Sequence, residues 1–432
     1  MESLWQKSLS LSTCEALEGN LSTDVLVIGS GLSGLLAAYM LKNRGVDCVV
    51  VEKGRVCSAT TAHSTAKITA QHGLVYRKIL KSYGEEYARM YFEANNDAVG
   101  KLKRLCAEAG CAFEEKSNFV YSYNANKVHD ELKALERLNI PYIYSEILPL
   151  PLTASCAVGF GNQAQFNPLE LARFLAKGLR IYENTWVREL VGTKAITDKG
   201  EIKAEKVVVA THFPFINKHG SYFLKLYQHR SYILALSNAE KLDDMYVDDD
   251  KAGMSFSSFG GFLLLGGGGH RTGKKGGSFN ELRAFKETHF SDVEESFAWA
   301  AQDTMSLDSI PYIGNYSKNT PDMYVCAGFN KWGMTSSMVS AEIISSEILG
   351  EKKDYAPVFS PSRSILKPQI LVNGFESARN LLVPSVKRCP HLGCALKYNK
   401  AEHSWDCACH GSRFSQSGKV LDGPANGDLK MN

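Results

Sequence analysis

The sequence lacks the charge excess that is typical of nucleic-acid-binding proteins. Its 49 Lys and Arg residues nearly cancel its 46 Asp and Glu residues, which leaves a formal net charge of +3. Such a balance, without a long basic run, does not favour binding to a phosphate backbone. We therefore expect no nucleic-acid partner.

Long apolar runs are also missing. The first 20 residues have no basic start followed by an apolar core, so they do not read as a signal peptide. Apolar runs such as residues 48–51 have the length of a β-strand and are too short to cross a bilayer. These features predict a cytoplasmic protein with no membrane span. A chain of 432 residues has room for about two or three domains.

The segment "DVLVIGSGLSGLLAAYMLKNRGVDCVVVEK" (24–53) has the order strand, glycine turn, helix, strand and acid. In this pattern Gly29 makes the tight turn, Gly31 lets the backbone approach a pyrophosphate, and Gly34 allows close packing of helix and strand. The helix start at Leu32 and Ser33 stabilises phosphate charge. Glu52, followed by Lys53, is placed to bond a ribose hydroxyl. The pattern predicts dinucleotide binding but does not separate NAD from FAD.

A second nucleotide fingerprint is absent from the sequence. The glycine run 266–269 is followed by "HRTGKKGG", which does not predict a helix. We therefore expect electrons to enter from a small organic substrate rather than from NAD(P)H.

Two further segments favour FAD. Residues 58–76 are rich in small hydroxyl side chains, and residues 322–350 predict a strand, a glycine-containing turn and a helix. Together with "KVVVATHFPF" (206–215) and "LDSIPYIG" (307–314), they resemble the FAD-dependent oxidoreductases of the D-amino-acid oxidase and sarcosine oxidase superfamily. The resemblance implies that the pyrophosphate and flavin are contacted by Thr60, Thr61, Thr65, Ala66 and Lys67. It further implies that adenine contacts the backbone of Val187, and that the flavin ring lies against Gly333, Met334 and Thr335.

This resemblance implies an α/β (α+β) fold, in which a Rossmann-like FAD-binding domain carries an inserted substrate domain with a mixed sheet. The oxidoreductase module would span residues 20–355. Its FAD part would comprise about 20–75, 155–215 and 305–355, and its substrate part about 76–154 and 216–304. The helical spacing of apolar residues from Tyr87 to Leu105 predicts a core-facing helix.

Two residues are candidates for catalysis. Lys67 stands where amine oxidases of this superfamily often carry Arg, and it would place a positive charge near the flavin; a structural ion pair is the competing interpretation. His270 follows the strand-like "FLLLGGGG" and would enter a pocket, unless it belongs to a surface turn. No cysteine is clearly placed to bond the flavin, so we expect non-covalent FAD.

The carboxyl-terminal segment "CPHLGCALKYNKAEHSWDCACHGS" (389–412) concentrates metal-ligand residues. Cys389 and His391 form one pair, and Cys407 and His410 form a second pair. Thiolates and imidazoles in two short loops suit zinc or iron. A four-ligand zinc site is the simpler alternative.

The same segment strongly resembles a Rieske [2Fe–2S] domain, spanning residues 365–432 as a small all-β unit. The resemblance implies that Cys389 and Cys407 bind one iron, and that His391 and His410 bind the other. It also implies a disulfide between Cys394 and Cys409 and a proline loop over the cluster at 418–425. Few residues precede the first ligand pair, so we expect a trimmed fold, joined to the rest by a linker at 350–364.

The two cofactors suggest a converter between two-electron and one-electron chemistry. Our leading hypothesis is an FAD-dependent oxidoreductase, acting as a dehydrogenase or oxidase. It takes a hydride from a C–N (or C–O) bond of an organic substrate, such as an amine or amino acid. It then passes single electrons through the cluster to a one-electron carrier. One alternative is a non-catalytic electron-transfer or redox-sensing protein. Another is that the cluster serves only as a structural staple.

Overall fold

The amino-terminal fingerprint folds as part of a mostly parallel sheet. The structure is a computed structural model that describes residues 2–384 and 387–430. Strand β1 (Leu21–Ile28) pairs in parallel with β2 (Cys48–Val51) on one side and with β10 (Glu201–Val209) on the other. The strand order is β16-β17-β10-β1-β2-β7, and β8 and β9 extend it beside β10. The remaining strands are β7 (Arg180–Tyr182), β8 (Val187–Val191), β9 (Lys194–Thr197), β16 (Tyr312–Asn315) and β17 (Met323–Ala327).

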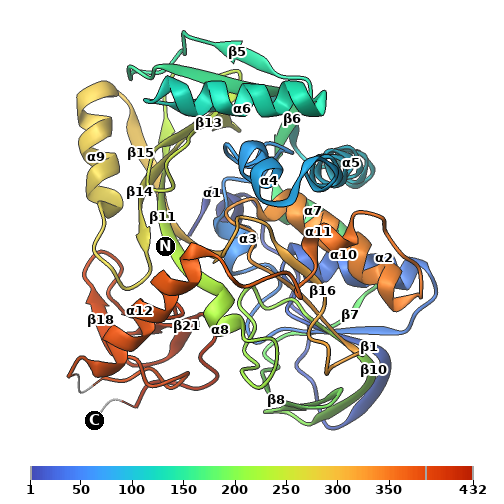
Figure 1. Cartoon of the computed structure of the whole chain (residues 1–432). Coiled ribbons are helices and arrows are strands. Elements are labelled where there is room, and N and C mark those ends of the chain that lie inside the picture. Colours follow the sequence, from blue (N-terminus) through green and yellow to red (C-terminus); the bar gives the residue numbers. More distant parts are fainter. Residues whose placement is uncertain (1, 385–386, 431–432) are drawn as a thin grey trace.

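A second, mixed sheet lies beyond the first (Figure 1). Its order is β15-β11-β14-β13-β12-β4-β6-β3, with β5 paired to β6. The expected division assigns 155–215 to the FAD part; β6 lies in that range but pairs with β4 and β3 in the second sheet. Its strands are β3 (Lys67–Ile68), β4 (Phe113–Ser122), β5 (Ile143–Ser145), β6 (Cys156–Phe166), β11 (Leu226–Ser237), β12 (Met245–Asp248), β13 (Ser255–Phe259), β14 (Phe262–Arg271) and β15 (Glu294–Ser306).

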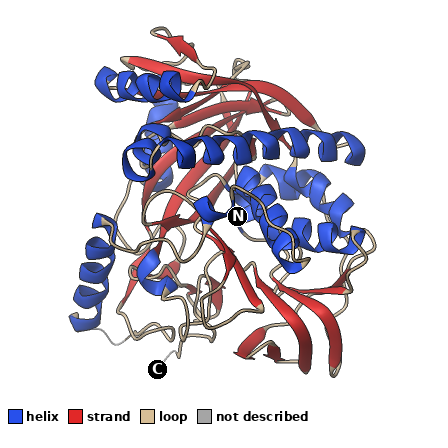
Figure 2. Cartoon of the chain, turned by 45° about the vertical axis from the view of Figure 1, so that its right-hand side comes forward, coloured by secondary structure: helices blue, strands red, loops and turns tan. Residues whose placement is uncertain are grey.

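Several helices, among them α2 (Leu32–Asn43), α5 (Glu85–Ala109) and α10 (Gly333–Ile348), lie between the two sheets, whereas α6 (Ala125–Leu138) and α9 (Ser278–His289) cover the outside of the second sheet (Figure 1 and Figure 2). The longest, α5, ends at Gly110, whose φ of 65° suits a helix terminus. As the spacing predicted, α5 buries an apolar stripe that includes Tyr91, Ala98 and Leu102. The other helices before the linker are α1 (Leu4–Ser8), α3 (Thr60–His63), α4 (Tyr76–Tyr83), α7 (Pro168–Ala176) and α8 (Tyr222–Lys225).

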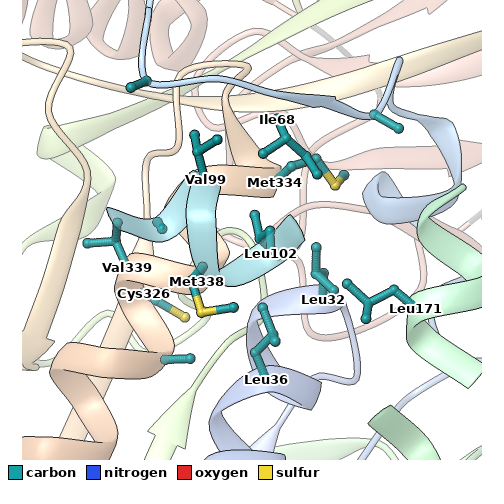
Figure 3. Close-up of a cluster of buried hydrophobic side chains, with 14 of the residues drawn as sticks. Leu32, Leu36, Ile68, Val99, Leu102, Leu171, Cys326, Met334, Met338 and Val339 are labelled. Atoms are coloured by element: carbon teal, nitrogen blue, oxygen red, sulfur yellow. The ribbon is translucent and has the colours of Figure 1, made fainter. Parts of the chain in front are cut away.

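A large apolar cluster contains residues of both sheets. Figure 3 shows Leu32 and Leu36 of α2 facing Met338 of α10 and Leu102 of α5. All four side chains are buried, and the cluster continues through Ile68 of β3. This shared core fixes the fingerprint helix relative to the second sheet.

The carboxyl-terminal part is a four-stranded antiparallel sheet in the order β18-β19-β20-β21. The strands are β18 (Leu396–Asn399), β19 (Ser404–Cys407), β20 (Arg413–Ser415) and β21 (Val420–Asp422). The linker holds the short α11 (Ala356–Phe359), and α12 (Pro368–Leu382) occupies the short stretch before the first ligand pair. The predicted α/β architecture with a small β unit at the end is confirmed. Within the described ranges, no helix has the length and apolar character needed to cross a lipid bilayer.

Candidate functional site: a flavin cavity beside a cluster site

Each glycine of the fingerprint has a distinct steric reason. A Cβ at Gly29, where φ is +104°, would lie 2.5 Å from the carbonyl oxygen of Ala210, and one at Gly34 would collide with the backbone of Gly29. A Cβ at Gly31 would meet only Thr61 Oγ1, at 3.5 Å. Gly29 and Gly34 therefore serve packing, whereas Gly31 borders open space in which a pyrophosphate fits.

The first turn of α2 points at this space. Its N-cap, Gly31, provides no side-chain cap, and the N–H of Leu32 donates to Thr61 Oγ1 at 3.1 Å. The positive end of the helix thus faces the cavity. The Glu52 carboxylate accepts from the N–H of Ser30 at 3.0 Å and of Gly54 at 2.9 Å, so it is held at the end of β2.

One cavity of about 360 Å³ runs from this fingerprint to the second sheet. Of the predicted cofactor residues, Gly34 does not line it, and Thr335 instead donates from its hydroxyl to the carbonyl of Thr69 at 2.8 Å. The elongated cradle and its helix N-termini fit a dinucleotide. The predicted residues that line it are Gly29, Gly31, Leu32, Ser33, Glu52, Lys53, Thr60, Thr61, Thr65, Ala66, Lys67, Val187, Gly333 and Met334.

The two candidate catalytic residues differ in position. Lys67 is buried in the cavity wall, and its Nζ donates to Thr65 Oγ1 at 2.9 Å. Burial, aided by the charge of Lys116, lowers the pKa of Lys67 to about 7. The ring of His270 lies 3.0 Å from the hydroxyl of Tyr232, and it is Tyr232 that lines the cavity. The catalytic roles of both remain predictions.

Further charged groups line the substrate-sheet end of the cavity. Lys251, Lys331 and Asp303 lie in its wall. Burial lowers the pKa of Lys331 to about 8, against the opposing effect of Asp303. Burial also raises the pKa of Asp303. The sequence analysis missed Lys251 and Asp303 because they lie on a separate loop and strand without a motif, and it did not single out Lys331 within the segment 322–350 that it assigned to the flavin.

Two loops bring the predicted metal ligands together. In the first, the N–H of Cys389 donates to the carbonyl of Cys394, and in the second the N–H of Gly411 donates to the carbonyl of Cys407, each at 2.9 Å. A disulfide between Cys394 and Cys409 joins the loops, with 6.7 Å between the Cα atoms. This is the pairing that the Rieske resemblance implied.

The four ligand side chains fit a bound cluster. Cys389 and Cys407 are buried free thiols, and the rings of His391 and His410 lie 4.9 Å apart. Nδ1 of His391 and both ring nitrogens of His410 are buried without a hydrogen-bond partner among the described residues. Buried polar atoms are normally bonded, so these nitrogens suit metal coordination. A hydrogen bond from the neighbouring Cys389 thiol lowers the pKa of Cys407 despite its burial, and backbone N–H groups of residues 409–411 lower it further.

The predicted cluster ligands lie directly behind one wall of the cavity. The ring of Phe213 lines the cavity and lies 6.4 Å from the ring of His391 and 6.2 Å from that of His410. Leu421 to Gly423, Ala425 and Asn426, in and after the predicted proline loop, line the same cavity. The sequence analysis missed Phe213; its place just beyond the carboxyl end of a parallel strand, where ligands bind in such sheets, was the available signal.

Polar contacts hold the two parts together. Arg271 donates to the carbonyls of Ala408 at 3.1 Å and Cys409 at 3.2 Å. Gln302 donates to the carbonyl of Gly411 at 2.9 Å. Arg230 pairs with Glu402, and both side chains are buried. The ligand loops are therefore fixed against the second sheet.

Comparisons with known proteins agree with this geometry. Residues 24–347 match the family described as FAD dependent oxidoreductase, and residues 364–431 match the Rieske [2Fe-2S] domain. YhfW of Bacillus subtilis (strain 168), described as a Rieske 2Fe-2S iron-sulfur protein, is 32% identical over an alignment of 497 positions that covers 100% of this chain and 97% of YhfW. The cytochrome b6-f complex iron-sulfur subunit of Fritillaria agrestis is 54% identical over 51 residues, 12% of this chain and 22% of that subunit.

Solved structures share the fold of the flavin module. Glycine oxidase from Geobacillus kaustophilus has a TM-score of 0.67 and 19% identity, covering 80% of this chain and 99% of that one. L-proline dehydrogenase from P. horikoshii has a TM-score of 0.66 and 19% identity, covering 80% and 98%. The family match spans most of the sequence and the second match contains all four cluster ligands, so this chain belongs to the FAD-dependent oxidoreductase family and carries a carboxyl-terminal Rieske [2Fe–2S] domain.

Proposed function

We propose that this protein oxidises an amine or amino acid and delivers the electrons singly to a one-electron carrier. FAD supplies hydride acceptance when bound, and the [2Fe–2S] cluster supplies one-electron transfer. The observation that carries the proposal is the composition of the cavity wall. Residues of the nucleotide fingerprint line one cavity with residues in and after the predicted proline loop, namely Leu421 to Gly423, Ala425 and Asn426.

The charged end of the cavity supports a carboxylate-bearing substrate. The buried Lys67 and the half-buried Lys331 line it together with the Tyr232 side chain. The same wall holds Asp303 and Asp248, whose pKa values are raised by burial, which favours their neutral forms. Buried or half-buried cations stabilise an anion more strongly than exposed ones because water screens them less. A carboxylate held there would leave the adjacent C–N bond for oxidation, so we favour an amino acid over a simple amine. The solved relatives named for proline and glycine act on amino acids, which agrees with this choice.

The reaction must balance over two electrons. The substrate loses two electrons and two protons and becomes an imine, which water converts to a carbonyl compound and an amine. Two molecules of a one-electron carrier are each reduced once. Lys67 serves as the cation beside the cofactor, and the buried walls exclude bulk water from the reacting carbon.

Anaerobic mixing with a panel of N-methyl amines, primary amines, amino acids and hydroxy acids tests this function. We expect an amino acid to bleach the flavin absorbance. Cys407→Ser should keep flavin bleaching and lose turnover with ferricyanide as acceptor. Failure of the whole panel would favour an electron-transfer or sensing protein, and unchanged turnover in Cys407→Ser would favour a structural staple.

A further inference from the structure

The segment of residues 211–217, which follows β10, contacts both the flavin cavity and the cluster ligands. Its Phe213 ring is buried and packs edge-on against both ligand histidines while lining the cavity. Its Asn217 side chain places Oδ1 2.9 Å from Nε2 of His391. We refer to residues 211–217 as the bridge segment.

The bridge segment is held in place at several points. The N–H of Phe213 donates to the carbonyl of Thr211 at 2.7 Å. The ring of His212 accepts from the N–H of Thr304 at 3.1 Å, and the hydroxyl of Tyr316 donates to the carbonyl of Ile216 at 2.9 Å. These contacts make the segment a fixed part of the flavin module.

We propose that the bridge segment couples the flavin cavity to the cluster, with Phe213 filling the path and Asn217 acting as a positioning residue for His391. The proposal deepens the proposed function and rests on it. Because Nε2 of His391 contacts Asn217, its Nδ1 is the nitrogen left to hold iron when the cluster is bound, and this buried Nδ1 has no hydrogen-bond partner among the described residues. A hydrogen bond from the outer nitrogen fixes the ring and raises its basicity as a ligand.

Asn217 therefore affects the cluster from outside the Rieske domain. A more basic ligand stabilises the oxidised iron, so Asn217→Ala should raise the cluster potential and Asn217→Asp should lower it. We expect the two variants to differ by about tenfold in the one-electron equilibrium constant, or about 59 mV. A redox titration followed by EPR measures this without substrate. Asn319→Ala, at an exposed position in another loop, is the control and should match the wild type. Two variants with the wild-type potential would overturn the role of Asn217.

Phe213 is tested by the rate of electron transfer. Phe213→Leu keeps apolar bulk and removes the ring contacts to both histidines. After photochemical reduction of the flavin, cluster reduction should slow by about tenfold or more while both potentials stay unchanged. Phe285→Leu is the matched control, because Phe285 lies on α9, outside the bridge segment, and its ring packs on Phe256 and Phe290. An unchanged rate in Phe213→Leu would overturn the bridge. Because light replaces the substrate, this outcome is independent of whether the predicted substrate is right.

A second feature, helix α12, packs with its polar face inward. Asn373 and Asn380 are buried: Asn373 accepts from Arg271 at 3.0 Å, and the carbonyl of Asn380 accepts from the N–H of Ala395 at 2.9 Å. Glu376 on the same face accepts from Lys274 at 2.6 Å. A surface helix normally buries its apolar stripe, so α12 has the reverse arrangement.

The apolar face of α12 is exposed. Leu371, Phe375 and Leu382 share one side of the helix and are 76%, 67% and 83% exposed. The end of this side meets the first ligand loop, where Leu392 is 40% exposed and Arg388 donates to the carbonyls of Leu381 and Gly393. Figure 1 shows α12 near β18 at the outside of the molecule. Exposed apolar patches of this kind mark interaction sites.

We infer that this face docks an acidic one-electron carrier protein. Its position beside the exposed part of the ligand loop would bring the carrier next to the cluster. Charge supports an acidic partner: residues 365–432 contain nine Lys and Arg against five Asp and Glu, and Glu402 and Asp406 among the acids are already paired with Arg413. Opposite charge on a carrier would steer its approach.

Plastocyanin serves as an acidic probe, with ferricyanide as a small acceptor. The double variant Phe375→Ser and Leu382→Ser should lower the second-order rate constant for plastocyanin about tenfold and leave ferricyanide unaffected. Ile147→Ser, at an 86% exposed site between β5 and β6, should match the wild type with both acceptors. The plastocyanin rate should also fall as salt rises. A plastocyanin rate constant in the double variant equal to that of the wild type would overturn a carrier as the occupant. So would a wild-type protein that binds vesicles or dimerises, if the double variant loses that property.

Discussion

Arg363 and Asp308 form a buried, two-point ion pair between the linker and the flavin module. Nε of Arg363 lies 3.2 Å from Oδ2 of Asp308, and Nη2 lies 3.1 Å from Oδ1. The same guanidinium donates to the carbonyls of Pro311 at 3.0 Å and Ile310 at 2.9 Å. The linker is therefore anchored just before α12.

Removing Arg363 should destabilise the protein strongly. Arg363→Ala leaves Asp308 buried without its partner, and such losses cost about 3–5 kcal/mol. Urea denaturation, followed by tryptophan fluorescence, measures the change in the free energy of unfolding. Arg44→Ala breaks the exposed pair with Glu351 and should cost less than about 1 kcal/mol. Similar losses for the two variants would contradict this assignment.

Gly31→Val should remove FAD and leave the cluster. A Cβ at position 31 would lie 3.5 Å from Oγ1 of Thr61. The two methyl groups of valine would extend beyond it into the space that the pyrophosphate needs. Flavin absorbance and acid-labile sulfide report the two cofactors separately. Gly100→Ala, in α5, has room for a methyl group and should retain both. Stoichiometric FAD in Gly31→Val would place the pyrophosphate elsewhere.

The purified protein should contain two irons per chain and no zinc. His410→Ala should lose the cluster, and His391→Cys should change its EPR spectrum, because each ring supplies a ligand nitrogen that the described structure leaves unpaired. Metal analysis with a sulfide assay checks the content. His403→Ala is the control, since His403 lies on the exposed hairpin between β18 and β19. Zinc without sulfide would refute the cluster.

Two residues beside the ligands should tune the cluster potential in opposite directions. Phe414 is fully buried in the core that contains Cys389 and Cys407, and it has no donor. Phe414→Tyr should add a hydrogen bond to a sulfur and raise the potential. The hydroxyl oxygen of Ser412 accepts from the N–H of Ala425 at 3.1 Å, which leaves its proton free to donate, so Ser412→Ala should lower the potential. A titration in which Phe414→Tyr is unchanged would mean that residue 414 points away from the cluster.

Lys67 should give flavin reduction a pH dependence. Because burial lowers its pKa to about 7, the amine is charged below that pH and neutral above it. If the cation assists the cofactor, the rate should fall as pH rises through about 7. Lys67→Met should remove this dependence and Lys67→Arg should extend the fast rate to higher pH, as measured by stopped-flow absorbance. If Lys67→Met shows the same dependence of the reduction rate on pH as the wild type, Lys67 has a structural role only.

Local sequence patterns predicted the parts of the site that are close in the chain. Gly29, Gly31 and Glu52 meet within one strand–helix–strand unit, and the four cluster ligands fall in one short segment. The spacing itself carries the chemistry in both cases, because turns and loops fix the positions of nearby residues.

Contacts between distant segments could not be predicted. Asn217 reaches His391 across 174 positions, and no local pattern reports that pairing. The reversed packing of α12 also escaped prediction, because its inward Asn373 and Asn380 are satisfied only by partners on other elements. The register of the long strands was also out of reach. In the second sheet β11 pairs with β15 so that Tyr232 lies opposite Ala300, and the sequence alone does not specify this register.

The anchoring of the ligand loops by Arg271 and Gln302 also determines how electron transfer between flavin and cluster should depend on the viscosity of the solvent. A tethered domain that swings between two stations is slowed by viscous solvent and stops when frozen. Here the carbonyls of Ala408, Cys409 and Gly411 are bonded directly to the second sheet, so the separation of the two redox centres does not depend on diffusion of the domain. We expect transfer between them to proceed at nearly the same rate in glycerol solutions, and to continue within a crystal.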